Sequence, residues 1–254
     1  MSVDPFRGLD PKPTGFGTCA GCPYRDTGTA MLCYRCARQT MRGLPRHRCR
    51  VCGQALGAPG AECANPVCNW SDREFRWNFA VAMRDGALER SITAYKYQGR
   101  RGWALIFGRV LAGFLYEYQT TFDEFDLVTP SPTFVGPGGR PFDHTAAVLR
   151  EAAKLDVTGL VFALDPPVIV KTGPTTPLVG LNWQQRRHVV EVEWPPVLDV
   201  PHPSRVRGKA ILVYDDVFTD GLLLNTVAGK LRQTGATTVC QVTLARQPWV
   251  RPGR

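Results

Sequence analysis

The chain has 254 residues, of which 44% are hydrophobic, and its formal net charge of +9 suits either polyanion partners or a basic surface without a special partner. Its longest apolar stretch, residues 103–118, is interrupted by Arg109 and is shorter than the roughly 20 residues of a spanning helix, so we expect no membrane segment. The first 17 residues are rich in Pro and Gly without an apolar run, so we expect no secretion signal and a soluble, cytoplasmic protein.

Eight of the nine cysteines fall in the N-terminal part of the chain and form four close pairs: Cys19/Cys22, Cys33/Cys36, Cys49/Cys52 and Cys63/Cys68. Because zinc binds four thiolates tetrahedrally, and a CxxC turn points two sulfurs at one ion, this layout predicts two structural zinc sites. Ten-residue spacers within each half favour sequential over interleaved pairing. Iron–sulfur ligation, redox use and replacement of one cysteine by His47 are the alternatives. Cys240 stands alone in an apolar segment and is expected to be buried and inert.

The cysteine-rich region is also basic, with seven arginines between Cys19 and Cys52 against one acidic residue, Asp26. Arginines on a rigid metal scaffold are suited to contact phosphates, and Arg46, Arg48 and Arg50 are the candidates for contact with single-stranded DNA. Nearby aromatic residues such as Trp70 are suited either to base stacking or to a small core around the metal. We place this double zinc-binding, zinc-ribbon-like region at residues 1–72.

The remainder, residues 73–254, has the pattern of an α/β domain. Expected strands and helices alternate along it: a strand at 73–83, helices at 88–95 and 103–115, a strand at 127–128, a helix at 145–154, strands at 168–170 and 210–214, a helix at 222–233 and a strand at 238–244. Residues 197–208 are expected to form an exposed loop. The final strand, helix and strand make a βαβ unit, which predicts a parallel sheet.

The segment 210–224 contains the most informative motif. An apolar strand leads to two adjacent carboxylates, Asp215 and Asp216, and a short loop with Thr219 and Gly221 precedes the helix. Glycine allows close approach of the backbone to a ligand, and the first helix amides form an anion site. Acidic residues beside such a site are suited to bind sugar hydroxyls, so the motif predicts a ribose-5-phosphate site. A simple strand–turn–helix corner is the alternative.

This segment resembles the motif of type I phosphoribosyltransferases that binds phosphoribosyl pyrophosphate (PRPP), an apolar strand followed by Asp-Asp-x-x-Thr-Thr-Gly-x-Thr. More narrowly, residues 19–247 are similar to the ComF family, which joins cysteine pairs to a phosphoribosyltransferase-like domain. Further matching segments are Tyr95-Lys96-Tyr97-Gln98-Gly99, Pro130-Ser131-Pro132, Arg140-Pro141-Phe142-Asp143-His144, Leu181 with Arg186-Arg187, and the ending around Gly235 and Arg246.

The resemblance implies an α/β, type I phosphoribosyltransferase-like parallel sheet flanked by helices, and a role in competence and DNA uptake beside a helicase-type uptake protein. It implies that Asp215 and Asp216 bind the ribose hydroxyls near Mg²⁺, and that the following loop binds the 5′-phosphate. The implied PRPP-binding residues are Asp215, Asp216, Val217, Phe218, Thr219, Asp220, Gly221, Leu222 and Leu223. Lys96, Arg140 and Arg186 are candidates for pyrophosphate contact, with solvated surface charges as the alternative.

Three positions depart from the family pattern: Asp220 and Leu223 replace threonines, and Pro141 replaces a glycine. At about 5 Å and an effective dielectric constant near 20, a carboxylate at Asp220 repels a phosphate by roughly 3 kcal/mol per unit charge. Asp220 is also suited to cap the helix amides in place of the phosphate. We therefore expect weakened PRPP binding, unless Mg²⁺ or a nearby arginine compensates. The functional hypotheses are a ComF-like accessory protein, an active phosphoribosyltransferase with an unknown acceptor base, and a scaffold that binds only proteins.

Overall fold

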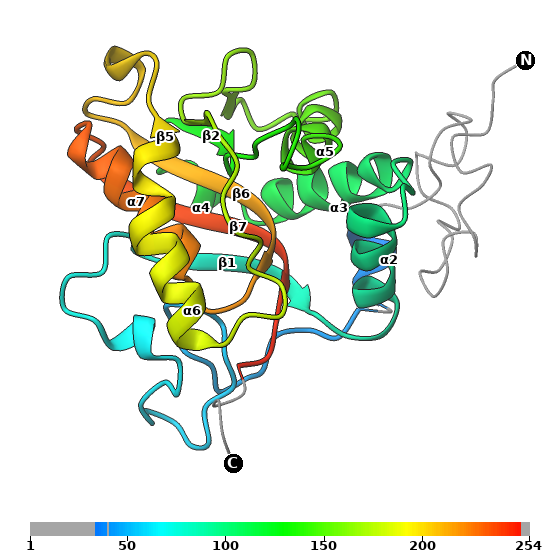
Figure 1. Ribbon diagram of the computed structural model, residues 1–254. Coiled ribbons are helices and arrows are strands. Elements are labelled where there is room, and N and C mark those ends of the chain that lie inside the picture. The colour runs from blue at the N-terminus through cyan, green and yellow to red at the C-terminus, as the bar shows by residue number, and fades with distance from the viewer. Residues whose placement is uncertain (1–33, 40, 250–254) are drawn as a thin grey trace, which may run out of the picture.

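A five-stranded parallel sheet forms the centre of the computed structural model, which describes residues 34–39 and 41–249. The strand order is β1-β7-β6-β2-β3. The strands are β1 (Asn78–Met83), β2 (Leu127–Pro130), β3 (Val161–Phe162), β6 (Ala210–Phe218) and β7 (Thr238–Arg246). The predicted α/β class, a parallel sheet flanked by helices, is confirmed (Figure 1).

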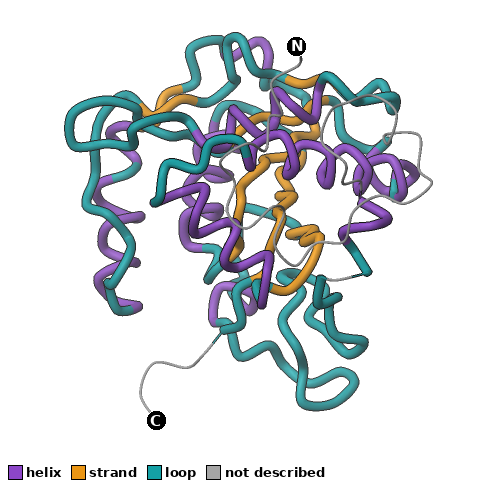
Figure 2. Tube along the Cα trace, turned by 90° about the vertical axis from the view of Figure 1, so that its right-hand side faces the viewer, coloured by secondary structure: helices purple, strands orange, loops and turns teal. Residues whose placement is uncertain are grey.

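Helices cover both faces of the sheet, as Figure 2 shows with the strands between them. One face packs against α2 (Gly86–Tyr97), α3 (Trp103–Glu117) and α5 (His144–Ala153), and the other against α7 (Leu222–Gln233). The alternation of β6 explains this arrangement, because successive side chains of a strand point to opposite faces. Leu212 and Tyr214 enter the first core, whereas Ile211 and Val213 enter the second.

The shorter helical segments lie in the connections between these elements. They are α1 (Tyr34–Ala37), α4 (Gln119–Phe122) and α6 (Trp183–His188), the 3-10 turns η2 (Pro66–Asn69), η4 (Pro195–Val197) and η5 (Pro203–Arg205), and the π-helical turn η3 (Val189–Glu193). Within the described residues, no helix combines the length and the apolar character that crossing a membrane requires.

The βαβ unit formed by β6, α7 and β7 matches its sequence prediction, and α7 spans the predicted residues 222–233. Gly235 follows the helix with a φ of 104°, a left-handed conformation that glycine adopts at helix C-termini. Two predictions between residues 168 and 208 hold only in part. The strand expected at 168–170 is β4 (Val170–Lys171), which pairs antiparallel with β5 (Leu198–Asp199) in a separate two-stranded sheet. The expected loop at 197–208 therefore contains a strand, and Val206 within it is fully buried.

The cysteine turn, which we define as residues 47–70, packs onto the edge of the sheet that carries β1. In Figure 1 it is the blue-to-cyan segment below β1, close to the end of β7. The Asn78 amide donates to the Val51 carbonyl at 2.8 Å, so the turn continues the hydrogen bonding of the edge strand. Its cysteines share one hydrophobic cluster with Phe75 and Phe218, and Phe218 ends β6.

Candidate functional site

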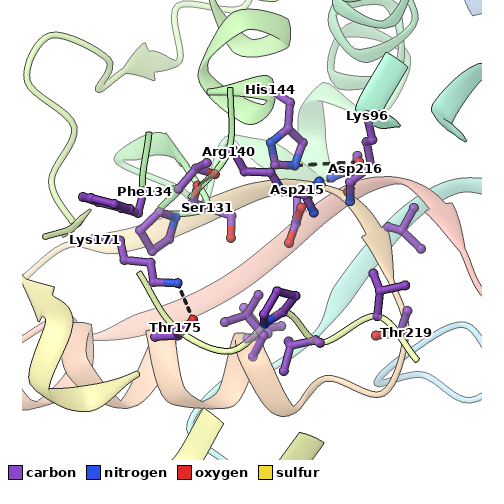
Figure 3. Close-up of a pocket in the computed structure, with 18 of the residues that line it drawn as sticks. Lys96, Ser131, Phe134, Arg140, His144, Lys171, Thr175, Asp215, Asp216 and Thr219 are labelled. Atoms are coloured by element: carbon purple, nitrogen blue, oxygen red, sulfur yellow. Dashed lines mark hydrogen bonds and ion pairs between the residues drawn. The ribbon is translucent and has the colours of Figure 1, made fainter. Parts of the chain in front are cut away.

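A cavity of about 560 Å³ opens at the carboxyl ends of β2 and β6 (Figure 3). From β2 the chain crosses through α5 to β3 on one side, and from β6 it crosses through α7 to β7 on the other. This reversal of strand order is the place where open α/β sheets bind ligands. Segments that lie far apart in sequence line the cavity, from α2 through the 131–144 connection and the 171–179 segment to β6 and the start of α7.

The structure brings most of the sequence-predicted residues to this cavity. Those that line it are Lys96, Arg140, Arg186, Asp215, Asp216, Val217, Phe218, Thr219, Asp220, Gly221 and Leu223. Leu222 is buried beside it and does not line it. Arg46, Arg48 and Arg50 lie elsewhere, exposed at the start of the cysteine turn and just before it. The chemistry of the cavity thus depends on β6 and the loop that follows it.

Two carboxylates at the end of β6 form the acidic side of the cavity. Asp216 is 1% exposed, and the Lys96 ammonium from α2 lies 2.9 Å from it. The His144 Nε2 atom at the start of α5 lies 3.9 Å from the same carboxylate. Asp215 is less buried, and its Oδ1 accepts a hydrogen bond from the Asp216 amide at 2.8 Å. The strand thus presents one paired carboxylate and one that faces the cavity.

These surroundings set the two carboxyl pKa values apart. Burial would raise the pKa of Asp216, but the charge and hydrogen bond of Lys96, together with the other neighbouring groups, hold that pKa below its usual range. Burial and the neighbouring Asp216 charge raise the pKa of Asp215 to about 7. Burial also lowers the pKa of His144 to about 3, so its imidazole is neutral at neutral pH. Asp216 is therefore ionised at neutral pH, whereas Asp215 titrates in the physiological range.

The same three residues fit a divalent cation. The His144 nitrogen and one oxygen each of Asp215 and Asp216 lie within 4.8 Å of one another. Carboxylate oxygens are the protein ligands that Mg²⁺ prefers, and it retains several waters when it binds through one or two of them. A cavity of this size has room for a hydrated ion beside a ligand. Asp215 and Asp216 are the residues that would hold Mg²⁺ here.

The loop after β6 turns on a glycine. Gly221 has a φ of 87°, and a Cβ at this position would lie 2.7 Å from Cζ of Phe218. Both the backbone conformation and the close packing therefore require glycine here. The first amides of α7 follow directly, and these have no partners within the helix. One of them, the Leu222 amide, donates to the Asp220 carboxylate at 3.0 Å. The N-cap of α7 is Gly221, so Asp220 bonds this amide from the preceding position and not as the cap expected from the sequence.

The charge of Asp220 is compensated within the chain. Arg186 of α6 donates from Nε to the Asp220 carboxylate at 2.7 Å, and both side chains are largely buried. The same guanidinium donates to the Thr219 hydroxyl at 3.0 Å and to the Leu178 carbonyl at 3.1 Å. The sequence predicted an uncompensated charge at Asp220 unless Mg²⁺ or a nearby arginine neutralised it. Arg186 is that arginine, so the Asp220 charge is neutralised within the chain.

Two basic residues of the cavity, Arg140 and Lys171, form what we call the basic wall. Figure 3 shows Lys171 at the opposite side of the cavity from Asp216 and Thr219. The Lys171 ammonium lies 3.9 Å from the centre of the Trp194 ring and donates to the Thr175 hydroxyl at 2.6 Å. Burial lowers the pKa of Lys171 to about 8. Sequence reasoning missed Lys171, since a two-residue strand gives no periodic signal. It also missed the role of His144 beside Asp216.

The four cysteines of the cysteine turn form a second cluster. The sulfurs of Cys49, Cys52, Cys63 and Cys68 lie within 4.8 Å of one another, and all four residues are buried. Tetrahedral zinc with Zn–S bonds of about 2.3 Å places sulfurs roughly 3.8 Å apart. The Cys52 and Cys63 sulfurs are 3.8 Å apart. The cluster fits a structural zinc ion with all ligands from the protein, and it confirms the predicted grouping of these four cysteines.

The second predicted zinc site lies outside the described part of the chain. Cys19, Cys22 and Cys33 belong to the residues that the structure does not describe, and of Cys36 only the backbone is described, in α1. That site stays a prediction. Cys240 is fully buried in β7, and burial raises the pKa of its thiol to about 12, in agreement with an inert residue.

A scan against protein-family models found no match, and a search of curated proteins found none either. Among solved structures, the chain is similar to the one described as the crystal structure of purine phosphoribosyltransferase from Pyrococcus horikoshii Ot3. The match covers 62% of this chain and 92% of that chain, at 17% sequence identity and a TM-score of 0.28. The resemblance to the ComF family stays a prediction.

Proposed function

We propose that the cavity binds PRPP and that the chain is a ComF-like protein of the phosphoribosyltransferase type. The single observation that carries the proposal is the ion pair between Arg186 and Asp220 at 2.7 Å. It removes the main electrostatic objection to a phosphate beside the loop. With the pair formed, the loop has no net charge, and the exposed amides of α7 supply a positive potential.

The acidic side of the cavity suits the ribose ring. Ionised carboxylates are strong acceptors for sugar hydroxyls, and Asp216 stays ionised because of Lys96. Asp215 lies directly beside it and faces the cavity. A ribose whose two hydroxyls lie against these residues would have its 5′ end directed to the loop 219–221.

The basic wall suits the pyrophosphate of PRPP. Arg140 and Lys171 both line the cavity, and neither forms an ion pair with a carboxylate among the described residues. Arg140 lies 5.2 Å from the centre of the Tyr97 ring, which supports its guanidinium. Fixed cations of this kind stabilise charge that develops on a leaving pyrophosphate. Transfer of the ribose phosphate to an acceptor base is therefore part of the proposal.

Isothermal titration with PRPP and Mg²⁺ tests binding. We expect micromolar affinity for the wild-type chain and a loss of about 100-fold for Asp216→Asn, since a charged acceptor is removed from the ribose. Arg186→Met is expected to weaken binding by about 100-fold, because it exposes the phosphate to the Asp220 charge. Adding Asp220→Thr to Arg186→Met should restore most of the affinity. Absence of binding at millimolar PRPP in the zinc-loaded wild type would overturn the proposal.

Release of pyrophosphate separates a transferase from a protein that only binds PRPP. The assay uses PRPP, Mg²⁺ and a panel of purine and pyrimidine bases with the full chain. Base-dependent release supports the enzyme, and PRPP binding without release from any base supports the accessory protein of the competence type. Lys171→Met is compared with the wild type in the same assay, since it removes one cation from the proposed pyrophosphate site and leaves Asp215 and Asp216 unchanged.

A second candidate function is contact with single-stranded DNA. The observation that favours it is the exposure of Arg46, Arg48 and Arg50 around the start of the cysteine turn, where none of them forms an ion pair with a described carboxylate. Replacing all three with Gln should reduce the slope of log K for DNA binding against log [salt] by about 2. An unchanged slope would exclude this surface.

A further inference from the structure

Arg246, the last residue of β7, is fully buried and is the largest of the fully buried side chains. It forms no ion pair with a carboxylate among residues 34–39 and 41–249. Burying a guanidinium without a counter-charge is strongly unfavourable. The chain must therefore supply negative charge to Arg246 from another source.

The source is the four-cysteine cluster. Arg246 Nη2 donates to the Cys52 sulfur at 3.4 Å. Four thiolates and one divalent ion leave a net charge of about −2, which a neighbouring cation stabilises. The buried arginine and the cluster therefore form one electrostatic unit, in which each explains why the other is tolerated in the interior.

The same guanidinium also holds the loop of the candidate ligand site. Arg246 Nη1 donates to the Thr219 carbonyl at 2.8 Å and to the Phe218 carbonyl at 3.4 Å. Its charge lies 5.0 Å from the centre of the Phe218 ring. One side chain thus connects a cysteine sulfur to the backbone on which Thr219 is positioned.

A second bridge runs through Asn65, which lies between Cys63 and Cys68 and is fully buried. Its side-chain amide donates to the Asp220 carbonyl at 2.8 Å, and its side-chain oxygen accepts from the Val67 amide at 3.3 Å. The carbonyls of Phe218, Thr219 and Asp220, at the end of β6 and in the loop after it, are therefore bonded to Asn65 of the cysteine turn or to the arginine that contacts a sulfur of this turn.

We propose that the four-cysteine metal centre and the ligand cavity are thermodynamically coupled through Arg246 and Asn65, which act as positioning residues for the loop 218–221. Metal at the cysteines holds the loop in its ligand-binding form. Because coupling is reciprocal, a ligand in the cavity tightens metal binding by the same factor. The ligand arm of this inference rests on the proposed PRPP binding, whereas the effect of the metal on the loop does not.

Hydrogen exchange of the amides in residues 218–224 tests the coupling without any ligand. We compare the full chain loaded with zinc and depleted of it by a zinc-selective chelator, with circular dichroism to verify that the sheet stays folded. We expect depletion to speed exchange in this segment by about tenfold. Unchanged exchange in a folded, depleted chain would overturn the coupling.

Variants then identify the bridge. In zinc-loaded Asn65→Ala and Arg246→Met, the segment should exchange as fast as in the depleted wild type. If Arg246→Met does not fold, Asn65→Ala and Arg246→Lys carry the test. Arg73→Met is the matched control, because Arg73 donates to the Cys68 carbonyl at 2.6 Å and supports the turn without contacting the loop. It should weaken zinc binding yet leave the loaded loop protected. Equal protection of the loop in Asn65→Ala and Arg73→Met would contradict the proposal.

Zinc release to the chelator, with and without saturating PRPP and Mg²⁺, tests reciprocity. In the wild type PRPP should slow release about tenfold, and in Asn65→Ala it should have no effect. Identical slowing in both proteins would overturn the inference. If the loaded wild type binds no PRPP, the proposed function fails by itself, and the exchange experiment still decides whether the metal controls the loop.

Discussion

Asp215 near the end of β6 and Thr219 in the loop that follows are four residues apart, yet the fold positions them by different means. Asp215 lies in a strand with neighbours on both sides, and its register partner in β7 is Thr243. Thr219 lies beyond the sheet, where side chains from the cysteine turn and from β7 hold the backbone. The comparison teaches that one continuous segment depends on two scaffolds, the parallel sheet and the cysteine turn with its four clustered cysteines.

The largest expected effect comes from breaking the second scaffold. Cys63→Ser removes one ligand of the cluster, and structural zinc in small domains contributes roughly 10–16 kcal/mol of apparent binding energy. We expect the Tm to fall by about 10 °C, which corresponds to roughly 4 kcal/mol for a chain of this size. Scanning calorimetry with zinc analysis checks this. Cys240→Ala is the control, since Cys240 is buried away from the cluster and should leave the zinc content unchanged.

Breaking the first scaffold should cost somewhat less. Lys96→Met leaves the Asp216 charge buried and unpaired, which typically costs about 3 kcal/mol of unfolding free energy at neutral pH. Because Lys96 lowers the pKa of Asp216, the stability that this pair contributes is present above the usual carboxyl pKa and is lost as pH falls. Urea unfolding of both proteins at several pH values should therefore show a gap that closes in acid. A constant gap would mean that the lost contact is not electrostatic.

A smaller effect is expected at Gly221, which lies between the end of β6 and the start of α7. Gly221→Ala introduces a Cβ into a left-handed backbone and against the Phe218 ring, at a cost of about 2 kcal/mol. Gly208→Ala is the matched control, because Gly208 has a φ of 74° but nothing within 4 Å of the added atom. Chemical unfolding and PRPP titration should show the larger loss for Gly221→Ala. Equal losses would show that packing against Phe218 does not matter.

The smallest expected effect is a change in the pKa of Asp215, near the end of β6. Burial and the charge of Asp216 raise the pKa of Asp215 to about 7. Asp216→Asn removes that charge, so the pKa of Asp215 should fall below 7. Carboxyl carbon shifts followed by NMR across the pH range measure this directly. A pKa that stays near 7 would leave burial as the only cause.

Sequence reasoning was strongest where structure is local. The bounds of α7, the Asp215-Asp216 pair after an apolar strand and the grouping of Cys49 with Cys63 all follow from periodicity or spacing over a few residues. The predictions that hold only in part fall between residues 168 and 208, where two strands of two residues each pair across a long connection. Such short strands have no alternation to detect.

Sequence reasoning could not predict the contacts that decide the chemistry of the site, because these contacts join residues far apart in the chain. Arg186 was a candidate for pyrophosphate contact, but its pairing with Asp220 joins residues 34 positions apart. No local pattern in the sequence indicates which of many arginines neutralises a given carboxylate. The pairing depends on how the fold places α6 beside residues 219 and 220, which only the folded chain reveals.

The contact between Arg246 and Cys52 spans 194 positions of the chain. During synthesis the cysteine turn leaves the ribosome long before β7 exists, and it can take up its metal early because all four described ligands lie between residues 49 and 68. The cation that stabilises the cluster arrives only when the final strand pairs with β1 and β6. On the coupling proposed above, residues 218–221 gain their contacts with Arg246 only after β7 has paired, and a chain that stops before β7 would lack those contacts.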